Sequence, residues 1–336
     1  RKLFASTIST PGGMAELLGQ VPANKGSATA IVFLAQVAKD FSALSASATL
    51  YRLVLDPSIS SDNANFALNL VHVLEAANTP WDALSAAKDF FKVNPNMKIG
   101  KNGCLCKELL EALIKSEVRS KKSAFEPPSH FARYIDDGER GLVVVEAVPC
   151  EGSASATSTA TTATERGTEQ LSDNSLDLLA LGFTIIKLLY SVGELSSICS
   201  FFALLEPSRQ RSKTLIHETS IRNEHAYYQC IAMTLSVRST MSFSSPDLDS
   251  VEIFKRSVSD PCKSPDLAAA AANPIYICGD SHSIVPAWSV LQASGGPRLL
   301  IPKLVTGCKH WHLRPESSFY PKANFVNVLK SIPKDA

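Results

Sequence analysis

Apolar residues recur every three to four positions through much of the first 235 residues, which is the spacing of one face of an α-helix. Between Ala30 and Phe41, for example, Phe33, Leu34 and Val37 share such a face. The dipeptides Asp-Pro and Glu-Pro and the run Asn-Pro-Asn mark helix ends. The pattern predicts helices over residues 30–41, 43–55, 65–76, 81–93, 106–118, 176–190, 195–205 and 221–235.

The pattern changes at Pro274, where the residues predict strand, turn, helix and strand. The apolar run Ile275 to Cys278 predicts a strand, residues 286–291 a short helix, and residues 298–305 a second strand. Pro302 inside that strand argues against a central place in a sheet. A last helix is expected around 323–329. This β-α-β order is the opening of a parallel α/β sheet, whose ligands lie at the carboxyl ends of the strands.

These elements divide the chain into six parts and predict a mostly α-helical fold followed by a partial parallel α/β segment. Residues 141–148 are either a strand or a buried run of another kind, and the Ser/Thr/Ala-rich residues 151–172 are expected to be a disordered linker or loop insertion. The parts are an N-terminal extension (1–26), a helical region (27–118), a loop and linker (119–172), further helical hairpins (173–236), a loop with a short helix (237–272) and the α/β segment (273–336).

Composition is that of a soluble globular protein, with 45% hydrophobic and 19% charged residues among 336. The net charge of +1 gives no electrostatic reason to expect nucleic acid or an anionic membrane as a partner. The apolar residues 176–205 are broken by charges and glycine, which favours a buried helical hairpin over a membrane span. The chain begins at Arg1 without Met, so we expect it to be a fragment.

The eight cysteines predict neither a disulfide framework nor a zinc site. They are scattered, and none forms a Cys-x-x-Cys pair, so we expect reduced thiols in an intracellular, cytoplasmic protein. We expect no metal and no cofactor.

The stretch Gly279-Asp280-Ser281-His282-Ser283 is the strongest candidate for chemistry. Gly279 allows a sharp bend after the first predicted strand, and such a turn mounts an exposed nucleophile at a strand end. Ser281 is therefore the candidate nucleophile, with its four neighbours as substrate contacts. Alternatively, Asp280 and Ser281 only satisfy turn and helix-cap hydrogen bonds.

Two histidines flank a tryptophan after the second predicted strand. If the two strands are neighbours, His310 or His312 could come near Ser281 and act as its base, while Trp311 and Arg314 would contact substrate. The alternative is that these histidines are only polar residues at a sheet edge. His282 follows Ser281 directly and cannot easily be its base, because adjacent side chains point apart.

The polar run Arg222-Asn223-Glu224-His225 lies within a predicted helix. We expect this run to pack against the second domain, the alternative being a solvated helix face. His72 lies among apolar residues and is expected to be structural.

The helical pairs resemble the tetratricopeptide repeat, a helix-turn-helix unit of about 34 residues. Measured back from Pro95, Ala83 occupies the small-residue position, and Leu70, Leu74, Ala87 and Phe90 occupy packing positions. The preceding pair, with Tyr51, Val54 and Pro57, matches more loosely. The resemblance implies a protein or peptide partner.

The Gly279–Ser283 run resembles the first block of the SGNH, or GDSL-type, hydrolases, in a branch that reads Gly-Asp-Ser-His-Ser. The resemblance implies that Ser281 is the nucleophile, that its backbone N–H helps to form the oxyanion hole, and that the chemistry is metal-free ester hydrolysis or acyl transfer, often on carbohydrates or lipids. The later Gly-Glu-Ile-Asp-Cys-Arg block of this family would lie beyond Ile332, and neither it nor the family's Asp-x-x-His base occurs before Ala336.

Two functions remain open from the sequence. One is a serine-nucleophile esterase or acyltransferase joined to a helical scaffold, incomplete in this chain. The other is a non-catalytic scaffold that binds a protein partner.

Overall fold

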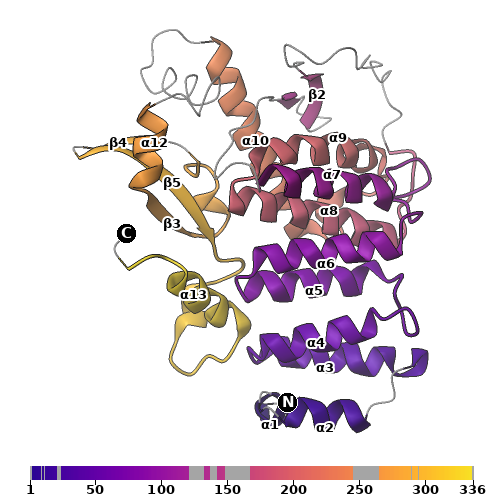
Figure 1. Cartoon of the computed structure of the whole chain (residues 1–336). Coiled ribbons are helices and arrows are strands. Elements are labelled where there is room, and N and C mark those ends of the chain that lie inside the picture. The colour runs from indigo at the N-terminus through magenta and orange to yellow at the C-terminus, as the bar shows by residue number, and fades with distance from the viewer. Residues whose placement is uncertain are drawn as a thin grey trace.

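The computed structural model of the chain is mostly α-helical, with a small sheet near the C-terminus (Figure 1). It describes residues 2–8, 10, 12–20, 24–120, 132–136, 142–147, 167–244, 265–288, 290–293 and 295–334. Most of the predicted disordered linker, and residues 245–264 of the predicted loop, lie outside these ranges.

Helices of the N-terminal half form pairs that stack one above another (Figure 1). Local sequence fixes their ends: the Asn63 side chain accepts a hydrogen bond from Phe66 N at 3.3 Å, and Pro80 begins the next helix. The helices are α1 (Lys2–Ile8), α2 (Gly13–Gln20), α3 (Ala28–Asp40), α4 (Leu44–Val54), α5 (Ala64–Ala76), α6 (Pro80–Val93) and α7 (Cys106–Ser120), with a short 3-10 turn η1 (Lys25–Ser27) before α3. The predicted helices are confirmed to within a few residues, whereas the repeat identity stays a prediction.

Three longer helices continue the helical region: α8 (Asp173–Val192), α9 (Leu195–Arg211) and, after the turn η2 (Ile216–Glu218), α10 (Arg222–Ser244). The predicted end of α9 at Leu205 was wrong, because the helix passes through Pro207. Glu206 accepts hydrogen bonds from Arg209 one turn later, which stabilises the helix across the proline.

A two-stranded antiparallel ribbon, β1 (Ala132–Asp136) and β2 (Leu142–Ala147), follows α7. Of the two alternatives for residues 141–148, a strand or a buried run of another kind, the structure has the strand, β2. The prediction of a loop over 119–140 missed β1, whose register with β2 pairs Ala132 with Ala147.

The C-terminal sheet has the strand order β3-β5-β4. After α12 (Pro265–Ala272), β3 (Ile275–Gly279) runs parallel to β5 (Gly296–Leu304), and β4 (Val290–Ala293) runs antiparallel to β5. The predicted helix over 286–291 was wrong, because the chain there turns into β4 and pairs back on β5. Pro302 is tolerated in the central strand because the pairing with β4 ends at Leu299. The last helix, α13 (Tyr320–Lys330), is confirmed.

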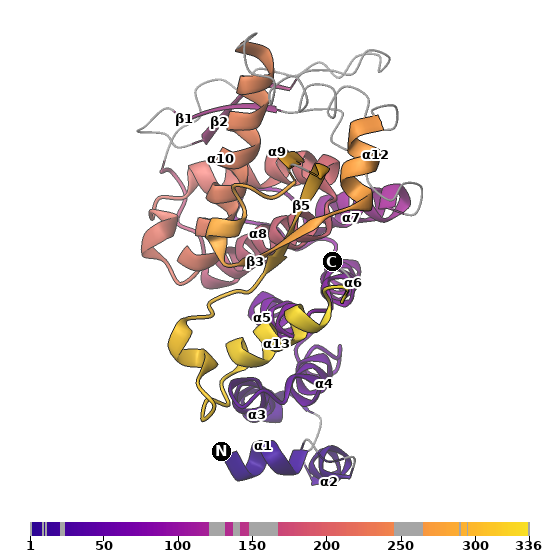
Figure 2. The same ribbon diagram turned by 90° about the vertical axis from the view of Figure 1, so that its left-hand side faces the viewer.

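The sheet and α13 pack directly on the helices, as Figure 2 shows for α13 beside α5. Trp288 Nε1 donates to the carbonyl oxygen of Tyr190 in α8 at 2.7 Å, and Tyr190 Oη donates to the carbonyl oxygen of Ile284 at 2.7 Å. On α13, Asn324 Nδ2 donates to the carbonyl oxygen of Ala76 at the end of α5 at 3.1 Å. The helical region and the C-terminal segment therefore share one core.

Helix α8 is the central element of this core. In the part of the chain that the structure describes, it is the one helix long and apolar enough to cross a membrane, yet 78% of its most apolar stretch is buried by the protein. This burial is that of a core helix, in agreement with the buried helical hairpin predicted over residues 176–205. A cytoplasmic location stays a prediction.

Lys187 is a charged residue buried within α8, with a side chain only 4% exposed. Its Nζ lies 2.8 Å from Oε1 of Glu75 on α5 and 4.7 Å from the centre of the Tyr227 ring on α10. The same carboxylate oxygen accepts a hydrogen bond from Oγ1 of Thr306, just beyond β5, at 2.9 Å. The ion pair thus joins two helices to the C-terminal segment.

Replacing Lys187 by Met should lower the free energy of unfolding by about 3 kcal/mol, because Glu75 would then be a buried charge without its partner. Chemical denaturation measures the change. Lys92→Met is the matched control, since Lys92 pairs with Asp89 on the surface with both side chains more than half exposed, and it should leave stability unchanged. Equal stability of Lys187→Met and the unmodified protein would show that the pair does not support the fold.

Candidate functional site

The Gly279–Ser283 turn leaves the carboxyl end of β3 as the sequence predicts. Asp280 caps the short 3-10 helix η3 (Ser281–Ser283) by accepting from His282 N at 3.1 Å, and Oγ of Ser283 donates to the Asp280 carbonyl oxygen at 2.7 Å. Val305 N, beyond β5, donates to the carbonyl oxygen of Gly279 at 2.8 Å. Asp280 therefore has the capping role, whereas the Ser281 hydroxyl has no hydrogen-bond partner among the described residues.

Ser281 is partly exposed and lines a cavity of about 470 Å³ between the helices and the C-terminal segment. The cavity opens beside the carboxyl ends of the parallel strands, where α/β sheets bind ligands. Its polar lining comes from helices α3, α5, α8 and α10 and from the loops and helix around the sheet: Lys39, His72, Glu75, Lys187, Asn223, Glu224, Tyr227, Asp280, Ser281, Thr306, Lys309, Tyr320 and Asn324.

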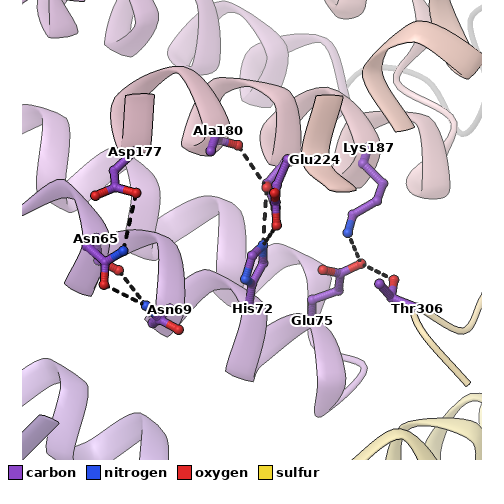
Figure 3. A network of polar contacts seen from close by, with 10 residues as sticks. Asn65, Asn69, His72, Glu75, Asp177, Ala180, Lys187, Glu224 and Thr306 are labelled. Atoms are coloured by element: carbon purple, nitrogen blue, oxygen red, sulfur yellow. Dashed lines mark hydrogen bonds and ion pairs between the residues drawn. The ribbon is translucent and has the colours of Figure 1, made fainter. Parts of the chain in front are cut away.

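Figure 3 shows the polar network on the helical side of this cavity. Lys187, Glu75 and Thr306 form one chain of contacts, at 2.8 and 2.9 Å. His72 forms the other: its Nε2 lies 3.5 Å from Oε1 of Glu224 on α10 and 3.4 Å from Oγ1 of Thr184. The helices thus supply a charged wall opposite Ser281.

Burial sets the protonation of this wall. It lowers the pKa of His72 well below the ordinary value, and the nearby charges of Lys187 and Lys39 lower it further, so His72 is neutral at pH 7. Burial also raises the pKa of Glu224 and lowers that of Lys39. Loss of hydration therefore disfavours the charged form of each of these three side chains.

The predicted histidines lie elsewhere. His310 and His312 belong to the 3-10 helix η4 (His310–Leu313), where His312 Nδ1 accepts from Lys309 N at 3.2 Å and the His312 ring packs edge-on against Phe319. Neither belongs to the residues that line the Ser281 cavity, nor do Trp311 and Arg314, which are exposed. The structure therefore does not bring this predicted base pair to Ser281.

His282 lies beside the candidate nucleophile Ser281 but points to solvent, with 92% of its side chain exposed. Its Nδ1 lies 2.8 Å from Oδ1 of Asp280. This hydrogen bond is the largest of the effects that lower the pKa of Asp280 below its usual value, so the carboxylate stays ionised at the rim of the cavity.

The four residues from Arg222 to His225 divide between two environments. Asn223 and Glu224 line the cavity between helices and sheet, in agreement with the interdomain hypothesis, and Arg222 is exposed. His225 is 3% exposed in the helical core, with its ring 5.7 Å from that of Phe183.

Sequence reasoning missed the helical wall of the site. The sequence predicts a structural role for His72 and gives no prediction for Lys39, Glu75 or Lys187. One signal was available for Lys187: a lone charge in the middle of an apolar helix needs a buried partner. Within the described ranges, no group of three or more His, Cys, Asp or Glu could hold a metal ion.

The buried His225 predicts a loss of stability in acid. Burial lowers its pKa from 6.5 to about 4 in the folded protein, so unfolding takes up a proton below pH 6.5. Its contribution is complete above pH 6.5 and falls by about 3 kcal/mol as the pH drops to 4. Chemical denaturation between pH 4 and 7.5 should therefore show the unmodified protein losing more stability than His225→Phe, in which His72 is retained. Parallel pH curves for the two proteins would contradict the assignment.

Comparison with known proteins finds no relative of this chain. No family model, no curated protein and no solved structure matches the chain. The likeness of Gly279–Ser283 to the SGNH hydrolases therefore stays an interpretation of those residues, and the functional argument rests on the geometry of the cavity.

Proposed function

We propose that the chain carries the nucleophile and the substrate cavity of a serine esterase or acyltransferase of SGNH type. The observation that carries this proposal is the place of Ser281: its hydroxyl lies past the carboxyl end of a parallel strand, makes no hydrogen bond to a described residue, and lines a cavity large enough for a substrate. A serine needed only for capping would use its hydroxyl in a hydrogen bond within the turn, as Ser283 does.

The proposed reaction is acyl transfer through Ser281. Its Oγ attacks the carbonyl carbon of an ester, the bond from that carbon to the leaving oxygen breaks, and an alcohol departs while the acyl group stays on the serine. Water or a second hydroxyl then takes the acyl group. No imidazole of the described residues lies within hydrogen-bond distance of Oγ. The proposal therefore names the nucleophile and the cavity, and it assigns the general base to none of the described residues.

The helices take part in this proposed site as its wall. Residues of four helices of the helical region line the cavity with Ser281, so this region would orient the substrate. The finer fold assignments belong to the same proposal: tetratricopeptide-like pairs for the helices, and part of an SGNH-type α/β domain for the C-terminal segment.

A second candidate is a non-catalytic scaffold that binds a protein partner through the helical pairs. One observation favours it, a cavity of about 210 Å³ between α4, α5 and α6 whose apolar lining includes Leu70 and Phe90. Under this alternative the Ser281 turn only binds or caps.

Labelling with a fluorophosphonate probe separates the two candidates. Ser281 in the intact chain should take the label, and Ser281→Ala should lose it. Ser318→Ala is the matched control, since Ser318 is an exposed serine of the same segment whose carbonyl oxygen, not its side chain, accepts from Oγ of Ser42 at 2.7 Å. Mass spectrometry of the labelled peptide identifies the site. No labelling, or labelling that survives Ser281→Ala, would reject the nucleophile and leave the scaffold.

A further inference from the structure

We propose that the Ser281 cavity binds a zwitterionic, amino-acid-like ligand, with the ligand's ammonium group at Glu224 and its carboxylate at Lys39. This inference deepens the proposed function by naming a substrate class, and its binding claim stands or falls without any reaction at Ser281. It starts from the charges that the cavity leaves uncompensated.

Glu224 is a largely buried carboxylate without a cation in contact. Its side chain is 15% exposed, and the basic group within ion-pair distance among the described residues is His72, at 3.5 Å. His72 is neutral, since burial lowers its pKa far below 7. The nearest lysine of the wall, Lys187, is already in contact with Glu75. A positive group on a ligand would therefore be the first cation in direct contact with Glu224, in a site of low polarity.

Lys39 is the matching cation on the other helical face of the cavity. Its Nζ lies 4.9 Å from the centre of the Tyr320 ring, and no described carboxylate lies within ion-pair distance of it. Burial disfavours its charge, and the carboxylates of Asp40, Glu75 and Glu224, which lie beyond ion-pair distance, only partly offset this cost. An acidic group on a ligand would complete the pairing.

Asn324 is a further residue of this lining whose hydrogen bonds are incomplete. It lines the same cavity and is 3% exposed, and its Nδ2 donates to the carbonyl oxygens of Ala76 and Glu75. Its Oδ1 is buried without a partner in the described structure. A buried acceptor of this kind costs free energy unless a donor reaches it, and an ammonium group carries three donors.

The lining argues against other ligand classes. No leucine, isoleucine, valine, methionine or phenylalanine is among the described lining residues, so a long acyl chain would find no large aliphatic side chain to pack against. The lining contains the carboxylates Glu75, Glu224 and Asp280 beside its lysines, which disfavours a polyphosphate. A neutral sugar could hydrogen-bond here but would leave Glu224 and Lys39 uncompensated. At the rim, Asp280 is engaged by His282, and Lys309 lies over the Trp311 ring.

Together with the proposed function, these contacts define the substrate as an ester carried on the side chain of such a ligand. Attack of Oγ of Ser281 would break the bond from the acyl carbon to the side-chain oxygen. The products are acyl-Ser281 and the free hydroxy-amino acid, and water then releases the acyl group as a carboxylic acid.

The test measures binding to Ser281→Ala, which cannot turn over the probe. O-acetyl-L-homoserine is titrated by calorimetry, together with its N-acetyl derivative, which lacks the ammonium group, and its methyl ester, which lacks the carboxylate. Each derivative should bind at least about tenfold more weakly than the zwitterion, because each loses one charged pair. Glu224→Gln and Lys39→Met, each combined with Ser281→Ala, should weaken binding of the zwitterion to a similar extent.

Glu218→Gln and Lys92→Met are the matched controls, since both side chains are more than half exposed, and they should not alter binding. Methyl glucoside and inorganic phosphate represent the other ligand classes. The inference is overturned if the zwitterion does not bind, or if either derivative, methyl glucoside or phosphate binds as tightly. The comparison of the zwitterion with its two derivatives uses only the Ser281→Ala variant. It therefore still tests the inference if Glu224→Gln or Lys39→Met fails to fold. Binding without Ser281 labelling would reject the esterase alone, and labelling without binding would reject the ligand class alone.

Discussion

The contact of Lys187 with Glu75 is the interaction on which the site depends. Lys187 brings a charge into the most buried helix of the protein, and a buried charge is tolerated only with a partner at close range. Glu75 is that partner, and it also accepts from Thr306 beside the sheet. One carboxylate thus fixes the spacing of two helices and the place of the C-terminal segment, and the cavity that Ser281 lines lies at this junction.

The cavity belongs to neither half of the chain alone. The strands deliver Ser281 and Asp280, and the helices deliver the charged wall. Cys230 on α10 even donates to the Ser281 carbonyl oxygen at 3.7 Å, so the helices contact the turn itself. A helical region that builds half of this cavity would orient a ligand bound there, so the proposed esterase site would use both parts of the chain.

Much of the fold could be predicted from local patterns, because the amphipathic spacing of residues such as Leu70 and Leu74 depends only on their own helix. The strand β4 before Gly295 could not, since it forms only because β5 is there to pair with it. The site divides in the same way. Ser281 follows from a local turn signature, whereas its opposing wall is set by tertiary packing that brings His72 and Glu224 together from residues 152 positions apart. His310 and His312 were attractive by spacing alone, and the packing of His312 on Phe319 places them away from the cavity lining.

The central claim, that Glu75 joins the helices to the Ser281 segment through Thr306, is tested most directly by a double-mutant cycle. Glu75→Gln, Thr306→Val and the double variant are compared with the unmodified protein by chemical denaturation. A hydrogen bond to a buried carboxylate predicts an interaction free energy of about 1–2 kcal/mol between the two positions. Strictly additive effects would contradict the account, because the helices and the sheet would then not meet at this contact.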